Sequence, residues 1–295
     1  MAELGPHDLR LMQGLAREVT ALRPELVTAD ASVGELAWVW SKGVDALGES
    51  WRHRLWFAGD RVVAWGWVSL SGSQLTWQVH PDRLELLPEI LDWYDEVAGE
   101  TERRVIVQSA DENALASVTK HGYAFDADDE SWTQANVREL TDLPDPVLPP
   151  GFRFRTADEV SVADAVEAHR GAWDRSQLTE SDFQRVRQTW PYRGDLHVLV
   201  EALDGTLVAS AIAWLDEENR IAEFEPVGTH RDFRRRGLGT ALQLYGMRQA
   251  KAAGATRMMV ACLGAATHPA ARSLYHGVGF RPYTRDMLHV KAARS

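Results

Sequence analysis

The feature that most restricts the fold of this chain is an internal repeat. Residues 113–125, NALASVTKHGYAF, align without a gap to residues 268–280, HPAARSLYHGVGF, and both segments contain a His-Gly pair and a final Phe. Upstream of these segments, two further pairs are similar and occur in the same order in both copies: 62–68 with 207–213, and 79–82 with 229–232. Three matching pairs in one order predict that the chain holds two copies of one fold.

A proline-rich segment separates the two copies. Residues 143–151, LPDPVLPPG, carry four prolines, and proline at that density continues neither a helix nor an inner strand. The length of 295 residues also exceeds the usual size of one domain. We therefore expect an N-terminal domain at 1–142, a stiff linker at 143–151 and a C-terminal domain at 152–295.

The second copy alternates strand-like and helical patterns. Short apolar runs between turn signals predict strands near 152–155, 196–202, 207–214, 220–228, 257–263 and 284–290. Helical periodicity and capping signals predict helices near 161–172, 179–189, 237–254 and 269–277. This order of elements indicates a mixed α/β domain of the α+β type.

Charge and composition exclude several classes of function. The net charge of −11 disfavours general nucleic-acid binding. The charge is unevenly shared, because residues 1–150 hold 12 Lys and Arg against 26 Asp and Glu, whereas residues 151–295 hold 20 against 17. No apolar run approaches the length of a membrane span, and the first residues lack a signal-peptide hydrophobic region. We expect a cytoplasmic protein with neither a membrane nor a nucleic acid as partner.

Cysteine and histidine usage gives no indication of a metal site. The single cysteine, Cys262, excludes an internal disulfide and argues against a cysteine-based zinc site. Its apolar surroundings, MMVACL, favour a buried core residue over a nucleophile. The histidines show no ligand spacing, so we expect no metal. Arginine outnumbers lysine by 28 to 4, which is typical of a GC-rich bacterial genome.

One stretch of the second copy predicts an anion-binding site. In residues 224–242, FEPVGTHRDFRRRGLGTAL, a strand pattern leads into three arginines and two glycines where a helix begins. The first turn of a helix presents unpaired N–H groups and partial positive charge, and glycine lets a phosphate approach the backbone. Arginine adds planar, multiply donating contacts to phosphate oxygens. No Gly-Lys-Ser/Thr follows, so the stretch is not a Walker loop.

This stretch also carries a family resemblance. Arg234-x-x-Gly237-x-Gly239 resembles the Gln/Arg-x-x-Gly-x-Gly/Ala motif of the GNAT superfamily of acyl-CoA-dependent N-acyltransferases. The second signature of that superfamily, Asn-x-x-Ala-x-x-Leu-Tyr-x-x-x-Gly-Phe, resembles residues 268–280, where His268 stands in place of the Asn. The first copy resembles the same fold without the glycines and arginines, so the layout is similar to tandem-domain members of the mycothiol synthase type.

The resemblance implies a fold and a coenzyme. It implies two tandem GNAT-like domains, each a central mixed, mostly antiparallel sheet flanked by helices, of which only the second is catalytic. It also implies acetyl-CoA as acyl donor, with the pyrophosphate held by the loop amides. The residues that it assigns to the coenzyme are Val227, Gly228, Thr229, Arg234, Arg235, Arg236, Gly237, Leu238, Gly239, Thr240 and His268.

Acyl transfer from a thioester to an amine requires a base for the ammonium and a proton for the leaving thiolate. The resemblance assigns the proton to Tyr275. Glu223 and Glu225 lie two residues apart on the preceding strand and so share one face, where either is a candidate base or a solvated surface residue. A break in strand pairing is expected near Val227 to Thr229, where the family exposes backbone amides to the acyl carbonyl.

The function that we expect is transfer of an acetyl group to a primary amine of a small molecule. The acidic first domain predicts a cationic acceptor, if its acids form one wall of the acceptor site. Two alternatives remain open, a non-catalytic acyl-CoA-binding or regulatory protein and a protein N-acetyltransferase. The sequence predicts neither the acceptor nor the acyl-chain preference, and it leaves monomer and homodimer equally open.

Overall fold

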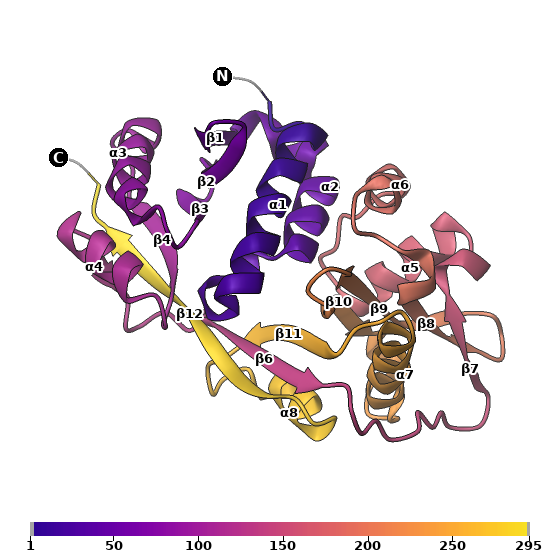
Figure 1. The fold of residues 1–295 in the computed structure, drawn as a ribbon. Coiled ribbons are helices and arrows are strands. Elements are labelled where there is room, and N and C mark those ends of the chain that lie inside the picture. Colours follow the sequence, from indigo (N-terminus) through magenta and orange to yellow (C-terminus); the bar gives the residue numbers. More distant parts are fainter. Residues whose placement is uncertain (1–2, 294–295) are drawn as a thin grey trace.

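The strands of both halves form one continuous sheet. The computed structural model describes residues 3–293, and its twelve strands follow the order β1-β2-β3-β4-β12-β6-β11-β10-β9-β8-β7, with the short β5 beside β12 (Figure 1). The pairs β3–β4 and β10–β11 are parallel, and the other neighbours are antiparallel. The predicted mixed, mostly antiparallel α/β architecture is confirmed.

The elements have the following bounds. The strands are β1 (Trp51–Ala58), β2 (Arg61–Ser69), β3 (Gln74–Val79), β4 (Arg103–Gln108), β5 (Ala124–Phe125), β6 (Thr133–Glu139), β7 (Phe152–Thr156), β8 (His197–Ala202), β9 (Leu207–Asp216), β10 (Ile221–Thr229), β11 (Arg257–Leu263) and β12 (Arg281–Lys291). The α-helices are α1 (Pro6–Leu22), α2 (Val33–Leu47), α3 (Leu87–Ala98), α4 (Glu112–Lys120), α5 (Val162–Ala172), α6 (Glu180–Gln188), α7 (Leu238–Ala252) and α8 (Pro269–Gly277). Within residues 3–293, none of these helices has the length and apolar character needed to cross a membrane.

The two halves repeat one order of elements. The series α1-α2-β1-β2-β3-α3-β4-α4 in the first half recurs as α5-α6-β8-β9-β10-α7-β11-α8 in the second. The segments that indicated the repeat occupy equivalent places, because 62–68 lies in β2 and 207–213 in β9. Each half also has a buried apolar cluster, packed against α3 in the first and α7 in the second. The tandem arrangement is therefore confirmed.

The strands and helices expected in the second half are all present, with bounds shifted by a few residues at most. The capping signal before α6 is an example. The Thr179 side chain accepts a hydrogen bond from the Asp182 amide, and the Asp182 carboxylate accepts one from the Thr179 amide. This reciprocal pair satisfies donors that the first turn of a helix otherwise leaves free.

The two halves exchange their last strands. Strand β6, the last of the first half, pairs with β11 and β12 of the second half. Strand β12, the last of the chain, pairs in turn with β4 and β5 of the first half. Figure 1 shows β6 and β12 side by side at the middle of the sheet. Each half therefore supplies a strand on which the other depends, although the proline-rich segment is the evident boundary in sequence.

Helix α2 of the first half is seated on β9 and β10 of the second. A Cβ atom at Gly34 would lie 2.5 Å from Cγ of Trp214, so glycine is what lets the helix backbone lie against this indole. The indole N–H of Trp214 donates to the backbone oxygen of Glu225 at 2.5 Å. The Gln13 amide also donates to the oxygen of Trp190 across the same interface, at 2.8 Å. The contacts of Gly34 with Trp214 and of Gln13 with Trp190 fix the first half against the second, where α2 lies beside the strand that carries both glutamates.

Candidate active site

Strand β10 leaves its parallel neighbour partway along its length. Residues 221–224 pair with β11, and this pairing ends at Phe224. The antiparallel pairing of β10 with β9 is irregular between Phe224 and Val227, at Glu225 and Pro226. The predicted break near Val227 to Thr229 is thus corrected, since Val227 to Thr229 pair regularly with β9. The break lies earlier because proline has no N–H to donate to a neighbouring strand.

A cavity of about 500 Å³ lies between this part of β10, the N-terminus of α7 and helix α8. Most residues predicted to contact the coenzyme line it: Val227, Gly228, Thr229, Arg234, Arg235, Gly237, Leu238, Gly239 and Thr240. Two others, Arg236 and His268, are not among its lining residues. We call this space the cradle cavity.

The start of α7 has the geometry expected of an anion site. Gly237 is the N-cap residue and has a left-handed backbone with φ of +81°. A Cβ atom there would meet no atom within 4 Å, so open space adjoins the first turn. The first amides of α7 have no partner within the helix and carry its partial positive charge. These residues fit a phosphate-bearing coenzyme.

The three arginines have different surroundings. Arg234 ties the loop to its neighbours, since its guanidinium donates to the backbone oxygens of Thr229 and Ala172. Arg235 is exposed, has a φ of +65° and lines the cradle cavity. Arg236 lies over the Phe233 ring, with 4.9 Å from Cζ to the ring centroid. Arg235 is thus the guanidinium best placed to reach an anion in the cavity.

Tyr275 lines the cradle cavity from α8. Its side chain is buried, with 7% of its surface exposed, and its ring packs edge-on against Phe280. Burial, followed by the nearby charge of Glu225, raises the pKa of the Tyr275 hydroxyl above its ordinary value. This hydroxyl therefore stays protonated and can act as a proton donor.

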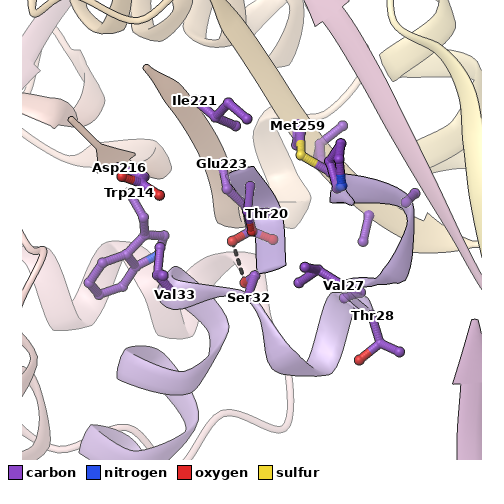
Figure 2. Close-up of a pocket in the computed structure, with 15 residues that line it drawn as sticks. Thr20, Val27, Thr28, Ser32, Val33, Trp214, Asp216, Ile221, Glu223 and Met259 are labelled. Atoms are coloured by element: carbon purple, nitrogen blue, oxygen red, sulfur yellow. Dashed lines mark hydrogen bonds between the residues drawn. The ribbon is translucent and has the colours of Figure 1, made fainter. Parts of the chain in front are cut away.

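The two glutamates of β10 have different surroundings. Figure 2 shows the Ser32 hydroxyl pointing at the Glu223 carboxylate, to which it donates a hydrogen bond of 2.5 Å. Ser32 is the N-cap residue of α2, so the first half of the chain holds this glutamate. Glu223 lines a cavity of only about 50 Å³, with Val27 and Met259 among its neighbours. Burial raises the pKa of Glu223 to about 8.

Glu225 instead faces a second, larger cavity of about 950 Å³, which we call the acceptor cavity. This space lies between α2 of the first half and the segment from α5 to α6 of the second. Burial raises the pKa of Glu225 to about 7, although the positive charge of Lys42 opposes this shift. Lys42 lines the same cavity, is exposed, and lies over the Trp38 ring.

Carboxylates of the first half lie near Glu225. Glu35 on α2 has a pKa well above its ordinary value, raised by burial and then by the charge of Glu225. Asp30 adds to this effect on both glutamates. Asp30 and Glu35 line a further cavity of about 290 Å³, together with Trp51 and Trp67. Asp30 and Glu35 thus lie near enough to Glu225 to act on its pKa, although they line a different cavity.

Sequence reasoning missed the contributions of the first half to this site. Ser32 and Glu35 have the Ser-x-x-Glu spacing that signals a helix start, and Ser32 does accept a hydrogen bond from the Glu35 amide. That local signal gives no indication that Ser32 also contacts Glu223, because the two residues are 191 positions apart. Trp173 lines both the cradle cavity and the acceptor cavity, and sequence reasoning missed this for the same reason.

Comparisons with known proteins agree with this geometry. Residues 163–280 match the family described as "Acetyltransferase (GNAT) family". Mycothiol acetyltransferase of Streptomyces coelicolor is 29% identical over 161 residues, which cover 52% of this chain and 50% of that protein. The match therefore spans about half the length of this curated relative.

Solved structures with the same fold cover the whole chain. A GCN5-related N-acetyltransferase from Sphaerobacter thermophilus has a TM-score of 0.63 and 22% identity, over 99% of this chain and 95% of that one. A tandem GNAT protein from the clavulanic acid biosynthesis pathway has a TM-score of 0.65 and 18% identity, over 100% of this chain and 98% of that one. Over its whole length the chain has the fold of tandem GNAT proteins, and the match to the GNAT family lies in its second half.

Within the described residues 3–293, no group of three or more His, Cys, Asp or Glu side chains is arranged to hold a metal ion. Cys262 is buried and accepts a weak hydrogen bond from the Asn136 amide at 3.5 Å. Burial raises the pKa of its thiol above the ordinary value. A protonated, buried thiol is a poor nucleophile, which agrees with a core role for this residue.

Proposed function

We propose that the protein is an N-acetyltransferase that moves an acetyl group from acetyl-CoA to a primary amine of a small molecule. The observation that carries this proposal is the meeting of two cavities at the break in β10. In β10, Glu225 and Pro226 line the acceptor cavity, and Val227 to Thr229 line the cradle cavity. A donor in one space and an amine in the other would meet at this point of the strand.

The coenzyme fits the cradle cavity through its phosphates and its thioester arm. The free amides at the start of α7, together with Arg235, supply donors for the pyrophosphate. Beyond Phe224, β10 has no parallel pairing to β11, so its edge is available to an extended, amide-containing ligand arm. The thioester would then lie near Val227 and Tyr275, which line the same cavity.

Glu225 is the base in this proposal. It lines the acceptor cavity, whereas Glu223 is held by Ser32 in a small space. A carboxyl group with a pKa of about 7 is matched to proton transfer near neutral pH, because a useful fraction is ionised and can still take up a proton. Glu225 would accept the proton that the attacking amine must lose.

Tyr275 is the acid in this proposal. The amine nitrogen forms a bond to the acyl carbon, the carbon–sulfur bond breaks, and the sulfur leaves with the electron pair. The hydroxyl of Tyr275 gives its proton to that sulfur. A phenol with an elevated pKa keeps its proton in the resting site and is therefore protonated when negative charge develops on the nearby sulfur.

The acceptor amine is expected to carry positive charge. Four acids line the acceptor cavity, Asp45 of the first half and Asp174, Asp182 and Glu225 of the second, against the two bases Lys42 and Arg175. Asp45 and the helix α2 that carries it give the first half a role at this site although it lacks the arginine-glycine loop. The single cysteine fits a reducing compartment, and we propose the cytoplasm as the site of action.

A thiol-release assay with acetyl-CoA and a panel of small primary amines tests this function. We expect thiol release that depends on the amine, strongest for cationic amines, and nearly lost in Tyr275→Phe. Tight binding of acetyl-CoA without turnover of any amine would favour the non-catalytic alternative. Turnover of peptide lysines alone would favour the protein acetyltransferase.

A further inference from the structure

The cradle cavity and the acceptor cavity share one lining residue, Trp173. It follows the last residue of α5 and is the C-cap residue of that helix. Strand β10 passes from one cavity to the other between Pro226 and Val227. An indole that borders both spaces stands where the reacting groups of donor and acceptor would have to meet.

The position of this indole is fixed by its neighbours. A Cβ atom at Gly228 would lie 2.5 Å from Cη2 of Trp173, so the ring lies directly on the strand backbone. The indole also stacks on His169, with 4.3 Å between ring centroids and 24° between planes. Arg234 donates to the backbone oxygen of Ala172, the preceding residue, at 3.0 Å. Because its ring lies between β10 and α5 and the backbone just before it is held by Arg234, the indole has little freedom to swing aside.

We propose that Trp173 limits the size of the acyl group that the protein accepts. The inference rests on the proposed function, because it needs the coenzyme arm to run along β10 toward Val227. An acyl chain longer than acetyl would extend from there toward the acceptor cavity and meet the indole. The ring thus restricts the donor to a short acyl group, and its removal would open a passage between the two cavities.

Binding of free CoA, acetyl-CoA, butyryl-CoA and hexanoyl-CoA, measured by calorimetry, tests this inference without a known acceptor. We expect the unmodified protein to bind hexanoyl-CoA at least about tenfold more weakly than acetyl-CoA, since an added methylene that does not fit is penalised at this scale or above. In Trp173→Ala the two affinities should lie within about threefold. In Trp173→Phe, which keeps a smaller ring in place, the difference should be intermediate.

Several results would overturn the proposal. Equal affinity of the unmodified protein for acetyl-CoA and hexanoyl-CoA would do so, and so would an unchanged affinity ratio in Trp173→Ala with acetyl-CoA binding intact. If Trp173→Ala does not fold, Trp173→Leu provides the same comparison with more of the packing retained. Failure of the proposed function gives different results: either neither CoA nor acetyl-CoA binds the unmodified protein, or both bind and the thiol-release assay shows no turnover of any amine.

Discussion

Replacement of Gly237 by glutamate tests the cradle cavity. Gly237 is the N-cap residue of α7, lines the cavity and adjoins open space, so a new side chain would enter the region assigned to the pyrophosphate. Its carboxylate would bring one negative charge close to a group that carries two. We expect the affinity for acetyl-CoA to fall by at least tenfold.

The magnitude follows from electrostatics. Two unit charges 4 Å apart interact by about 1 kcal/mol in a medium as polar as water, so repulsion by two phosphate charges costs about 2 kcal/mol. That energy corresponds to about thirtyfold in affinity, before any steric loss of backbone contact is added. The charge should not harm the fold, because a carboxylate at a helix N-terminus is favourable.

Gly205→Glu is the matched control. Gly205 has a φ of +87°, close to the +81° of Gly237, and a Cβ atom at either position meets nothing within 4 Å. Both variants therefore pay a similar cost of about 1–2 kcal/mol for a left-handed side-chain residue, and only one lies in the cavity. Calorimetry should show weak acetyl-CoA binding in Gly237→Glu and normal binding in Gly205→Glu. Normal binding in a folded Gly237→Glu protein would refute the assignment of the pyrophosphate to this loop.

Four further outcomes are expected. Tyr275→Phe should lower kcat by about 10²-fold and leave acetyl-CoA affinity within a few fold, because only the proton donor is removed; unchanged turnover would assign the proton to another group. In the unmodified protein kcat/KM should rise about tenfold from pH 6 to pH 8, because Glu225 ionises around its pKa of about 7. The Glu225→Gln variant should lose about 10²-fold in activity and should no longer show this rise with pH. A rise that persists in the variant would point to another base. For a cationic acceptor kcat/KM should fall as salt increases, since attraction by the acids that line the acceptor cavity is screened over about 10 Å at 0.1 M salt. A flat salt profile would exclude long-range attraction. A fragment of residues 152–295 should fail to fold, because it lacks β6, which pairs with both β11 and β12. A fragment of residues 130–295, which keeps β6, should show more helix and strand than the shorter fragment by circular dichroism. Equal melting curves for the two fragments would contradict the structural role of the exchanged strand.

The repeat and the second half could be predicted because their signals are local. The loop from Arg234 to Gly239 combines charge, glycine and a helix start within six positions, and Thr179 and Asp182 cap α6 as their spacing indicates. The break in β10 was expected about two residues too late, near Val227 to Thr229, because the expectation came from the family resemblance and not from the position of Pro226. The missing N–H of the proline decides the position in the structure.

The exchanged strands and the contact of Ser32 with Glu223 could not be predicted from the sequence in the same way. Strand β6 reads as an ordinary last strand of the first half, and only tertiary pairing shows that it lies between β11 and β12. Ser32 and Glu35 look like a helix start and nothing more until α2 is seated against Trp214. Contacts between residues far apart in the chain leave no pattern in the local sequence. At this site such a contact makes the two glutamates different, because Ser32 holds Glu223 whereas Glu225 lines the acceptor cavity.

The most direct test of the account is a crystal structure of the protein with acetyl-CoA. We expect the pyrophosphate to lie at the amides of residues 237–240 and the coenzyme arm to run along β10 beyond Phe224. The thioester sulfur should lie within hydrogen-bond reach of the Tyr275 hydroxyl, and Glu225 should lie on the side of the acyl carbon that faces the acceptor cavity. Acetyl-CoA bound in the first half, or bound in the second half with its thioester remote from Tyr275 and Glu225, would contradict it.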